Sequence, residues 1–250
     1  MIRYLTSDFG NYEKKDGQKI TRPIDNINGI VDQFKNDIKK FDKVVFVASD
    51  MNNPTEKVMS YANIFFDSLK MVGIEFTDYL VLDGSKINEA EQYINGADFV
   101  FLCGGDTYNQ HVFFEAINLK SLLENFQGVL VGQSAGALNM PSNVFNSPEE
   151  MEESEPVFFD GLGLVDINIE PHFEYDVSKF DDAKKYQREA IVKESFNRPI
   201  YGQVNKSHIR IDDDNKEVIY GETYLIENGK IVKICDNKNN VAINRKGKTL

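Results

Sequence analysis

Apolar and polar positions follow two different rhythms through the middle of the chain. Apolar residues recur at helical spacing over 27–40, 55–72, 88–95 and 112–125. Continuous apolar runs, typical of strands buried on both faces of a sheet, occur at 43–49 (KVVFVAS), 98–103 (DFVFLC) and 128–133 (GVLVGQ). This alternation, from about residue 43 to 140, predicts an α/β fold with a mostly parallel central sheet and helices on both faces.

The pattern of apolar and polar residues changes after residue 140. An acidic stretch over 147–156 (SPEEMEESEP) has no apolar period and favours a solvated loop or a short helix. A charged amphipathic helix is expected over 181–196, and alternating segments predict strands at 161–173, 199–209, 217–220, 223–227 and 230–235. We expect these strands to form a C-terminal β-rich extension of a single domain over residues 1–250, because no repeat or linker divides the chain. The polar segment 11–25 is predicted to be a loop.

The composition argues against several classes of protein. The 250 residues carry a net charge of −12 without a cluster of Lys or Arg, so neither nucleic acid nor an anionic membrane is an expected partner. No stretch approaches the roughly 18 to 20 apolar residues of a membrane span, and the first residues lack a signal-peptide pattern. Cys103 and Cys235 have no metal-binding spacing. We therefore expect a cytoplasmic protein; the sequence leaves its oligomeric state open, with a homodimer as one option.

The predicted strand over 128–133 runs directly into GQSAG, Gly132 to Gly136, ahead of a helix-compatible segment. A serine at such a strand-to-helix turn is lifted clear of the sheet, while the flanking glycines avoid collisions with neighbouring backbone. The N–H group of Ala135 would face the same space as the Ser134 hydroxyl, which makes it a candidate oxyanion donor. The alternative is a tight turn that needs its glycines for conformation only.

A serine nucleophile needs a base, and the chain offers His111, His172 and His208. His172 is favoured because its strand is expected to end at the same edge of the sheet as Ser134. A third group would orient the imidazole. Sequence pattern does not choose among the acidic candidates for that role, which are Glu149, Glu150, Glu152, Glu153, Asp160, Glu170 and Glu174.

The predicted strand at 98–103 ends in GGDT, Gly104 to Thr107, also at this edge of the sheet. Paired glycines let the backbone approach a ligand closely and can offer N–H groups to an anion. A plain strand-to-helix turn is the alternative. A phosphate-binding loop is disfavoured, because neither G-x-x-x-x-G-K-[ST] nor G-x-G-x-x-G occurs here.

Together these motifs resemble those of the dipeptidase E (α-aspartyl dipeptidase) family of serine peptidases, in the class I glutamine amidotransferase-like superfamily. FVFLCGGDTYNQ resembles the family's strand followed by G-G-[ND]-T, VLVGQSAGALNM its nucleophile turn, and GLGLVDINIEPHF the stretch with its catalytic histidine. The spacing also fits, since His172 follows Ser134 by 38 residues. The similarity covers roughly residues 43–173.

The resemblance implies a glutamine amidotransferase-like fold and a serine hydrolase that needs no metal or organic cofactor. It assigns Ser134 as the nucleophile and His172 as the base, with the N–H groups of Gly105 and Ala135 as the oxyanion hole. The substrate it implies is a dipeptide or another short peptide.

The resemblance also bears on two further positions. The family's third catalytic member lies about fifteen residues past the serine, where this chain has Glu149, with Glu150 as the reserve. Its aspartate-specific members hold the substrate's side-chain carboxylate with an arginine beyond the catalytic histidine. Arg188 lies in that region, beside Lys184 and Lys185, and could bind a carboxylate through its forked guanidinium. A surface charge on the predicted helix is the alternative reading of Arg188.

Three functions stay open on the sequence alone. The leading prediction is a cytoplasmic serine exopeptidase that works through an acyl-enzyme. The second is an esterase or amidase for a non-peptide substrate, which would use the same residues. The third is a non-catalytic ligand-binding protein, against which the intact Ser134, His172 and GGDT argue. Glutamine hydrolysis is disfavoured, because amidotransferases of this fold carry cysteine where this chain has Ser134.

Overall fold

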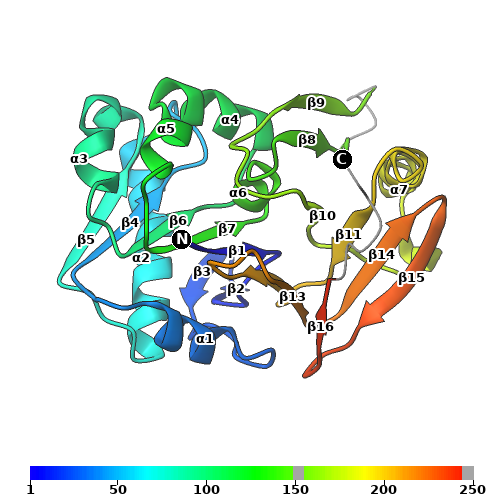
Figure 1. Cartoon of the computed structure of the whole chain (residues 1–250), viewed down its shortest axis with the longest axis horizontal. Coiled ribbons are helices and arrows are strands. Elements are labelled where there is room, and N and C mark those ends of the chain that lie inside the picture. Colours follow the sequence, from blue (N-terminus) through cyan, green and yellow to red (C-terminus); the bar gives the residue numbers. More distant parts are fainter. Residues whose placement is uncertain (149–154, 244–250) are drawn as a thin grey trace.

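The computed structural model of the chain describes residues 1–148 and 155–243. In these residues the largest sheet has eight strands in the order β16-β13-β12-β1-β7-β6-β4-β5 (Figure 1). Strands β1, β7, β6, β4 and β5 run parallel to one another, and β12, β13 and β16 continue the sheet with antiparallel pairings. The prediction of a mostly parallel central sheet is therefore confirmed.

Helices cover both faces of this sheet, as the alternation of patterns predicted (Figure 1). The strands are β1 (Ile2–Thr6), β4 (Lys43–Val47), β5 (Asp78–Leu82), β6 (Phe99–Leu102), β7 (Val129–Gln133), β12 (His208–Ile211), β13 (Glu217–Tyr220) and β16 (Asn240–Ala242). One face carries α1 (Ile30–Asp37) and α2 (Thr55–Met71). The other carries α3 (Ala90–Ile94), α4 (Thr107–Ala116), α5 (Leu119–Leu123) and α6 (Ala135–Leu138), and a 3₁₀ helix, η1 (Gly84–Glu89), precedes α3.

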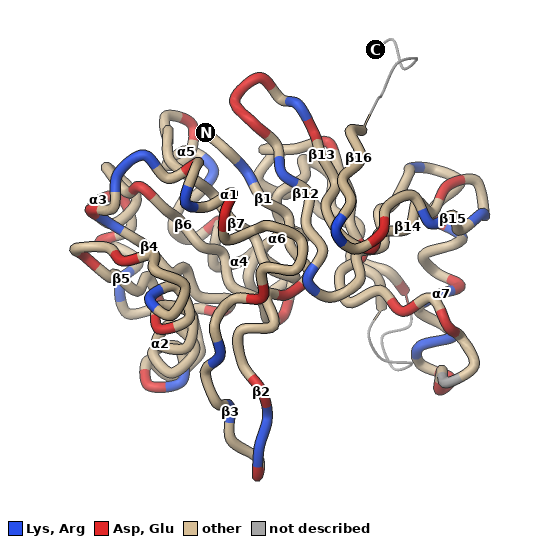
Figure 2. The backbone as a smooth tube through the Cα atoms, turned by 90° about the horizontal axis from the view of Figure 1, so that it is seen from below, with Lys and Arg blue, Asp and Glu red and all other residues tan. Residues whose placement is uncertain are grey.

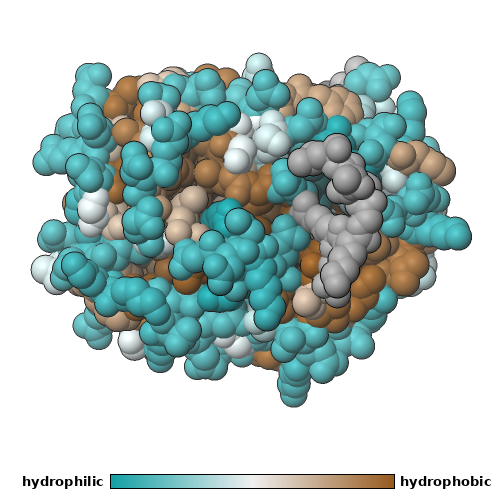
Figure 3. All heavy atoms as spheres, viewed as in Figure 1, coloured by the Kyte–Doolittle hydropathy of each residue, from teal (hydrophilic) through white to brown (hydrophobic). Residues whose placement is uncertain are grey.

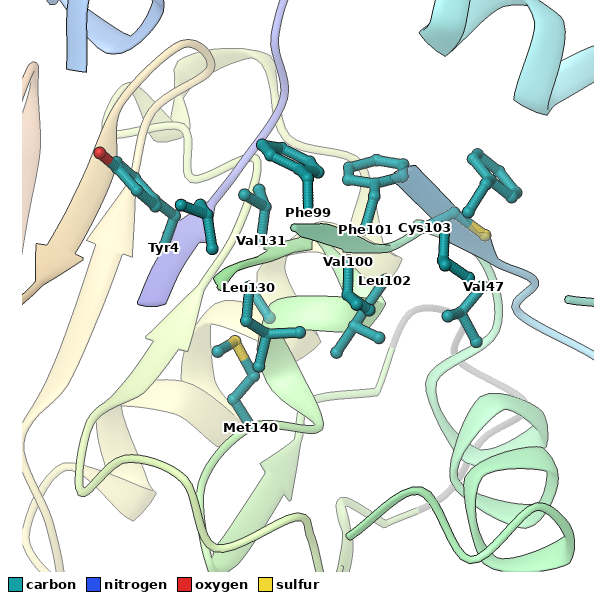
Figure 4. Close-up of a cluster of buried hydrophobic side chains, with 14 of the residues drawn as sticks. Tyr4, Val47, Phe99, Val100, Phe101, Leu102, Cys103, Leu130, Val131 and Met140 are labelled. Atoms are coloured by element: carbon teal, nitrogen blue, oxygen red, sulfur yellow. The ribbon is translucent and has the colours of Figure 1, made fainter. Parts of the chain in front are cut away.

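Side chains of the central strands fill the core on both faces of the sheet (Figure 4). Along β6, Phe99 and Phe101 point to one side, and Val100 and Leu102 point to the other (Figure 4). All four are buried, and the ring of Phe101 stacks on Phe65 of α2 with their centroids 3.8 Å apart. Burial on both faces explains why these strands are continuously apolar in the sequence.

A second sheet of four strands holds part of the C-terminal region: β10 (Asn168–Glu170), β11 (Ile200–Gln203), β14 (Thr223–Glu227) and β15 (Lys230–Cys235). Helix α7 (Asp182–Glu194) packs its Ile191 into a small apolar cluster with Ile200, Tyr224 and Ile226 of this sheet. A short 3₁₀ helix, η2 (Val177–Lys179), precedes α7. The predicted C-terminal strands are thus divided between the main sheet and the second one.

The helix predicted over 112–125 is wrong in its bounds. Helix α4 already begins at Thr107, because the Asp106 carboxylate accepts a hydrogen bond of 2.7 Å from the Asn109 N–H group and so caps the first turn. The segment breaks again at Asn118, whose φ of 50° is left-handed, and α5 follows. Capping therefore places the GGDT motif directly against a helix start.

The predicted loop over 11–25 is also wrong, because its centre is a hairpin of β2 (Tyr12–Lys15) and β3 (Gln18–Thr21). Asp16 and Gly17 both have positive φ, 52° and 78°, as the two-residue turns that match strand twist require. A second hairpin pairs β8 (Asn143–Asn146) with β9 (Val157–Asp160). The acidic stretch lies between β8 and β9, and its residues 149–154 are outside the described residues.

Hydrophilic residues cover most of the face shown in Figure 3, with apolar residues in smaller patches between them. Among the described helices, none combines the length and the apolar character that crossing a bilayer requires.

Candidate active site

Ser134 lies in the turn between β7 and α6, where the sequence placed it. Its backbone is in a region that non-glycine residues rarely adopt, with φ 50° and ψ −114°. Three backbone hydrogen bonds hold this conformation: the Ser134 N–H donates to the Thr6 carbonyl, and the Ser134 carbonyl accepts from the N–H groups of Ala137 and Leu138, each at 2.9 Å.

The glycines around Ser134 are required by close packing of backbone. A Cβ on Gly132 would lie 2.6 Å from the Ala137 nitrogen, and one on Gly136 would lie 2.2 Å from the Leu102 carbonyl oxygen of β6. Both contacts are with backbone atoms, which cannot swing away as a side chain can. The turn therefore has the tight strand-to-helix construction of a nucleophile elbow.

His172 meets Ser134 through its side chain, with 3.1 Å between Nε2 and the Ser134 Oγ. The imidazole is exposed, and its residue has a φ of 55°. The expectation that its strand ends at the edge of the main sheet was wrong. His172 follows β10, which belongs to the second sheet, so the hydrogen bond joins turns that leave two different sheets.

The other ring nitrogen of His172 contacts a neutral residue. Nδ1 lies 2.7 Å from the Asn205 Oδ1 and 3.5 Å from the Ser7 Oγ. Ser7 is fully buried; its hydroxyl donates to the same Asn205 oxygen at 3.1 Å and accepts from the His172 backbone N–H at 2.8 Å. Main chain and imidazole of His172 are therefore both tied to one small network.

This network determines the tautomer of His172. Because the Asn205 Oδ1 can only accept, the hydrogen must be on Nδ1, and the ring donates it to Asn205. In the neutral ring, the lone pair is then on Nε2 and is directed at the Ser134 hydroxyl. This is the tautomer that a general base needs.

The acidic residues proposed for the third position do not occupy it in the described part of the chain. Glu149, Glu150, Glu152 and Glu153 lie outside the described residues. Of the others, Asp160 is in β9, Glu170 accepts from Ser147 at 3.0 Å and from Gln187 at 3.2 Å, and Glu174 pairs with Lys184 at 2.5 Å.

The two rival histidines have separate structural surroundings. His111 packs on Phe159, with 4.5 Å between the ring centroids. His208 is completely buried in β12, stacks on Tyr220 and bonds to the Gln33 amide at 2.9 Å. Burial, and secondarily the charge of Arg210, lowers the pKa of His208 to about 3, so its ring is neutral.

The GGDT turn packs against the turn that carries Ser134. A Cβ added to Gly104 would meet the Ser134 Cβ at 3.3 Å. In the described residues, neither the Gly105 nor the Ala135 N–H donates a hydrogen bond to a protein acceptor. Free backbone donors in these two turns are the kind of group that can stabilise an oxyanion.

Two cavities meet at Ser134 and His172, which line both. The larger, about 470 Å³, extends between the sheet, α2 and the β2–β3 hairpin. The smaller, about 310 Å³, extends beside α7. Helices α2 and α7 lie at opposite ends of the molecule in Figures 1 and 2, so the cavities lead away from the nucleophile in different directions.

Arg188 lines the smaller cavity and is half-buried, which differs from a plain surface charge. Its guanidinium lies 4.3 Å from the ring centroid of Phe173 and 5.2 Å from that of Phe180, and it donates to the Glu174 carbonyl. Burial lowers the pKa of Arg188, while Glu170 and Glu174 act in the opposite direction. A fixed guanidinium at this position is suited to a carboxylate.

Cys103 lines the larger cavity, but it is not a rival nucleophile. Burial raises the pKa of its thiol to about 12, which keeps it protonated at neutral pH. Among the described residues, no group of three or more His, Cys, Asp or Glu side chains is arranged to hold a metal ion.

The sequence prediction missed Ser7 and Asn205. Residues 199–209 were interpreted as one strand, but β11 and β12 belong to different sheets, and the chain turns between them at Asn205, Lys206 and Ser207. Lys206 has a φ of 72°. The run of Asn, Lys and Ser was the available signal, because Asn and Ser favour turns through their side-chain hydrogen bonds.

Comparisons with known proteins give a family and a fold. The family model described as peptidase family S51 matches residues 23–219. A peptidase from an acI-B1 actinobacterium has a similar structure, with a TM-score of 0.69, 12% identity, and coverage of 97% of this chain and 96% of that one. A candidate peptidase E of Listeria monocytogenes EGD-e has a TM-score of 0.54, 20% identity, and coverage of 90% and 96%. No curated protein matches the sequence.

Proposed function

The chain belongs to peptidase family S51 and is a serine-type peptidase, and from this premise we propose that it is an exopeptidase acting on dipeptides or short peptides. The observation that carries the proposal is the hydrogen bond of 3.1 Å between the Ser134 Oγ and the His172 Nε2. A nucleophile within hydrogen-bond reach of its base, at the junction of two cavities, is the arrangement that acyl transfer from a bound peptide requires.

In the first half of the reaction, the Ser134 Oγ attacks the carbonyl carbon of the scissile bond while His172 Nε2 accepts the hydroxyl proton. The carbonyl oxygen becomes an oxyanion, which the N–H groups of Gly105 and Ala135 stabilise. When this intermediate collapses, the C–N bond breaks and His172 returns the proton to the leaving amine. The product is an ester between Ser134 and the acyl residue.

In the second half, water replaces the amine. His172 accepts a proton from the water as its oxygen attacks the ester carbon, and the same two N–H groups stabilise the new oxyanion. Collapse breaks the bond to the Ser134 Oγ, which takes the proton back from His172. The acyl residue leaves as a free acid, and the enzyme is restored.

We assign Asn205 as the residue that orients His172. Its Oδ1 holds the Nδ1 hydrogen in place at 2.7 Å and so keeps Nε2 available as the base. Because the amide is neutral, it fixes geometry and tautomer but stabilises the imidazolium less than a carboxylate would. A triad completed by Glu149 stays a prediction, since that residue lies outside the described residues.

For the substrate, we propose an acidic residue on the acyl side, with its carboxylate on Arg188. Support comes from the position of the guanidinium, which is half-buried against Phe173 in the same cavity as Ser134 and His172. We also propose a cytoplasmic location, which is supported by two cysteines that are both free and buried.

The test is hydrolysis of a dipeptide panel, Asp-X beside Asn-X, Ala-X and Lys-X, by the wild type and by Ser134→Ala. We expect cleavage of Asp-X, lost by more than about 10⁴-fold in the variant, which should keep the melting temperature of the wild type. Serine-dependent cleavage that ignores the first residue would discard the role of Arg188 and keep the mechanism. Hydrolysis that survives in Ser134→Ala would contradict the mechanism itself.

Acyl substrates that are not peptides serve as the comparison. If p-nitrophenyl esters or simple amides are turned over and no peptide is, the proposed substrate class is wrong and the chain is an esterase or amidase with the same nucleophile. If the folded wild type turns over none of these substrates, the favoured function becomes that of a non-catalytic ligand-binding protein of this fold.

A further inference from the structure

The β2–β3 hairpin has no place in the core, and yet it forms a wall of the larger cavity. Every residue of its two strands is exposed or only partly buried. Figure 2 shows the hairpin projecting from the body of the molecule beside α2. Its side chains alternate between two faces, with Tyr12 and Lys19 on the same one. Both residues line the cavity that also holds Ser134.

Lys19 is fixed in position without a carboxylate partner. Its Nζ lies 4.3 Å from the ring centroid of Tyr12 and 4.4 Å from that of Tyr61 on α2. Two aromatic faces attract and orient an ammonium group but leave its charge uncompensated. Among the described residues no carboxylate pairs with Lys19, and its pKa is lowered by partial burial and by the neighbouring charge of Lys14.

A second ammonium lines the same cavity one helical turn away. Lys57 precedes Tyr61 by four residues on α2, which places the two side chains on one face of the helix. The Lys57 Nζ donates to the Asn53 Oδ1 at 3.0 Å, so its hydrogen-bond partner is a neutral amide. Within the described part of the chain, two cations without carboxylate partners thus line the cavity from neighbouring elements.

The acidic residues of the cavity are engaged elsewhere. Asp8, Asp50 and Asp106 each accept a backbone N–H of their own turn, from Gly10 at 3.1 Å, Asn52 at 2.8 Å and Asn109 at 2.7 Å respectively. Each carboxylate keeps its negative charge, but among the described residues none of the three pairs with Lys19 or Lys57, whose contacts are with neutral groups. The lysines therefore remain available to an anion that enters with the substrate.

The rest of the lining is mixed. Its apolar part consists of Phe46, Ile64, Phe65, Phe101 and Cys103, from β4, α2 and β6 with the residue that follows it, and it lies beside polar residues such as Ser49, Asn53 and Gln133. Apolar surface together with two ammonium groups matches an amino acid that has an apolar side chain and a free carboxylate. Such a group is what a peptidase expels when it cuts the last peptide bond of a chain.

We propose that this cavity is the subsite for the leaving residue, and that Lys19 and Lys57 bind the free α-carboxylate of an apolar C-terminal residue. The proposal rests on the proposed function, which directs the acyl residue to the Arg188 cavity on the other side of Ser134. It gives the hairpin a role, since Tyr12 and Tyr61 hold Lys19 at the wall of the cavity that Ser134 also lines. The enzyme then requires that the scissile bond be followed by a single residue.

The test compares Asp-Leu with its C-terminal amide, Asp-Leu-NH₂, for the wild type and for Lys19→Met. We expect the wild type to prefer the free acid by about 10-fold or more in kcat/KM, as for a hydrogen bond to a charged group. In Lys19→Met the KM for the free acid should rise by about 10-fold while kcat and the values for the amide stay nearly constant. Lys57→Met should act in the same direction.

The matched control is Lys15→Met, which removes the same charge from the opposite face of the hairpin. It should leave both substrates unchanged. The proposal would be overturned if Lys19→Met lost the same activity towards the free acid and the amide. It would also be overturned if Lys15→Met lost as much activity towards the free acid as Lys19→Met. A variant that loses the preference for Asp over Asn at the first residue would overturn it as well, because the cavity would then hold the acyl side.

A binding measurement separates this proposal from the proposed function. Calorimetric titration of Ser134→Ala with Asp-Leu and Asp-Leu-NH₂ needs no turnover. One outcome is that the wild type cleaves neither peptide, Ser134→Ala binds the free acid more tightly than the amide, and adding Lys19→Met removes this difference in affinity. In that case the proposed exopeptidase activity is wrong and the carboxylate subsite is supported. If cleavage occurs without any preference for the free acid, the subsite fails and the exopeptidase stands.

Discussion

The turn that carries Ser134 and the turn that carries His172 meet in one hydrogen bond, but they are held by different means. Ser134 is held by backbone, with hydrogen bonds to β1 and α6 and glycines where neighbouring chain segments touch. His172 is held by side chains, through Ser7 and Asn205, which are 165 and 33 residues away in sequence. The position of Ser134 depends on a local pattern, whereas the position of His172 depends on contacts between distant segments.

The difference shows what can be learned from a sequence of this kind. A backbone turn with close contacts leaves a signature of small residues within a few positions, and GQSAG has it. A side-chain network leaves single Ser and Asn residues far apart in the chain. Replacing a glycine of the Ser134 turn should therefore mainly lower stability, whereas removing the Asn205 amide should mainly lower activity.

The largest effect is expected where backbone meets backbone. Gly136→Ala places a methyl group 2.2 Å from the Leu102 carbonyl oxygen, so β6 or α6 must shift, and we expect the free energy of unfolding to fall by about 3 kcal/mol. Gly96→Ala is the control: its φ is 72° but no atom lies within 4 Å of the added Cβ, so only about 1 kcal/mol should be lost. Denaturant unfolding of both variants measures the contrast, and equal losses would show that the close packing at Gly136 is unimportant.

The next effect concerns the side-chain network, and it should appear in activity alone. Asn205→Ala removes the acceptor for the His172 Nδ1 hydrogen, and we expect kcat/KM to fall by about 10- to 100-fold with an unchanged melting temperature, because Asn205 is exposed. Asn205→Asp should restore the orientation. Its carboxylate would also stabilise the imidazolium, so the acidic limb of the pH–rate profile should move to higher pH.

Glu149→Gln provides the comparison for Asn205. If Asn205→Ala keeps the full rate and Glu149→Gln loses it, the orienting role belongs to the acidic residue that family resemblance assigns. If both variants lose activity, both groups act on His172 during turnover. Only a loss confined to the Asn205 variants supports the network as described.

The smallest effect concerns the pH dependence of stability and comes from His208, which follows the Asn205 turn in the chain. His208 is buried and neutral, and burial lowers its pKa from the ordinary value of 6.5 to about 3, so the unfolded chain binds more protons between these values. Stability is therefore greatest above pH 6.5 and is lost as the pH falls towards 3, by about 1 kcal/mol at pH 5.5. Unfolding of the wild type and of His208→Gln across pH 5 to 7 measures this. A pH slope that is the same in both would assign the acid sensitivity to other groups.

Much of the fold followed from the pattern of apolar residues. The parallel strands β4, β6 and β7 were predicted because burial on both faces leaves continuous apolar runs, and α2 was predicted from its helical period. The start of α4 was missed, since a single side chain, Asp106, caps it. The hairpin β2–β3 was missed because its strands are polar and exposed, and a strand without a buried face leaves no apolar alternation.

The sequence best predicted those parts of the candidate site that depend on neighbouring residues. Ser134 and the GGDT turn were identified from neighbouring residues. His172 was identified although its strand was assigned to the wrong sheet. Asn205 could not be identified, because its role arises only where the break between β11 and β12 brings it to the imidazole.

The proposed activation of Ser134 as a nucleophile by His172 can be tested without knowing the substrate. The measurement is the rate of covalent labelling by a fluorophosphonate, followed by intact mass, for the wild type, Ser134→Ala and His172→Ala. We predict a single adduct on Ser134 in the wild type, none in Ser134→Ala, and a rate at least about 100-fold lower in His172→Ala. Labelling that persists in Ser134→Ala, or that proceeds equally fast without the imidazole, would contradict the account.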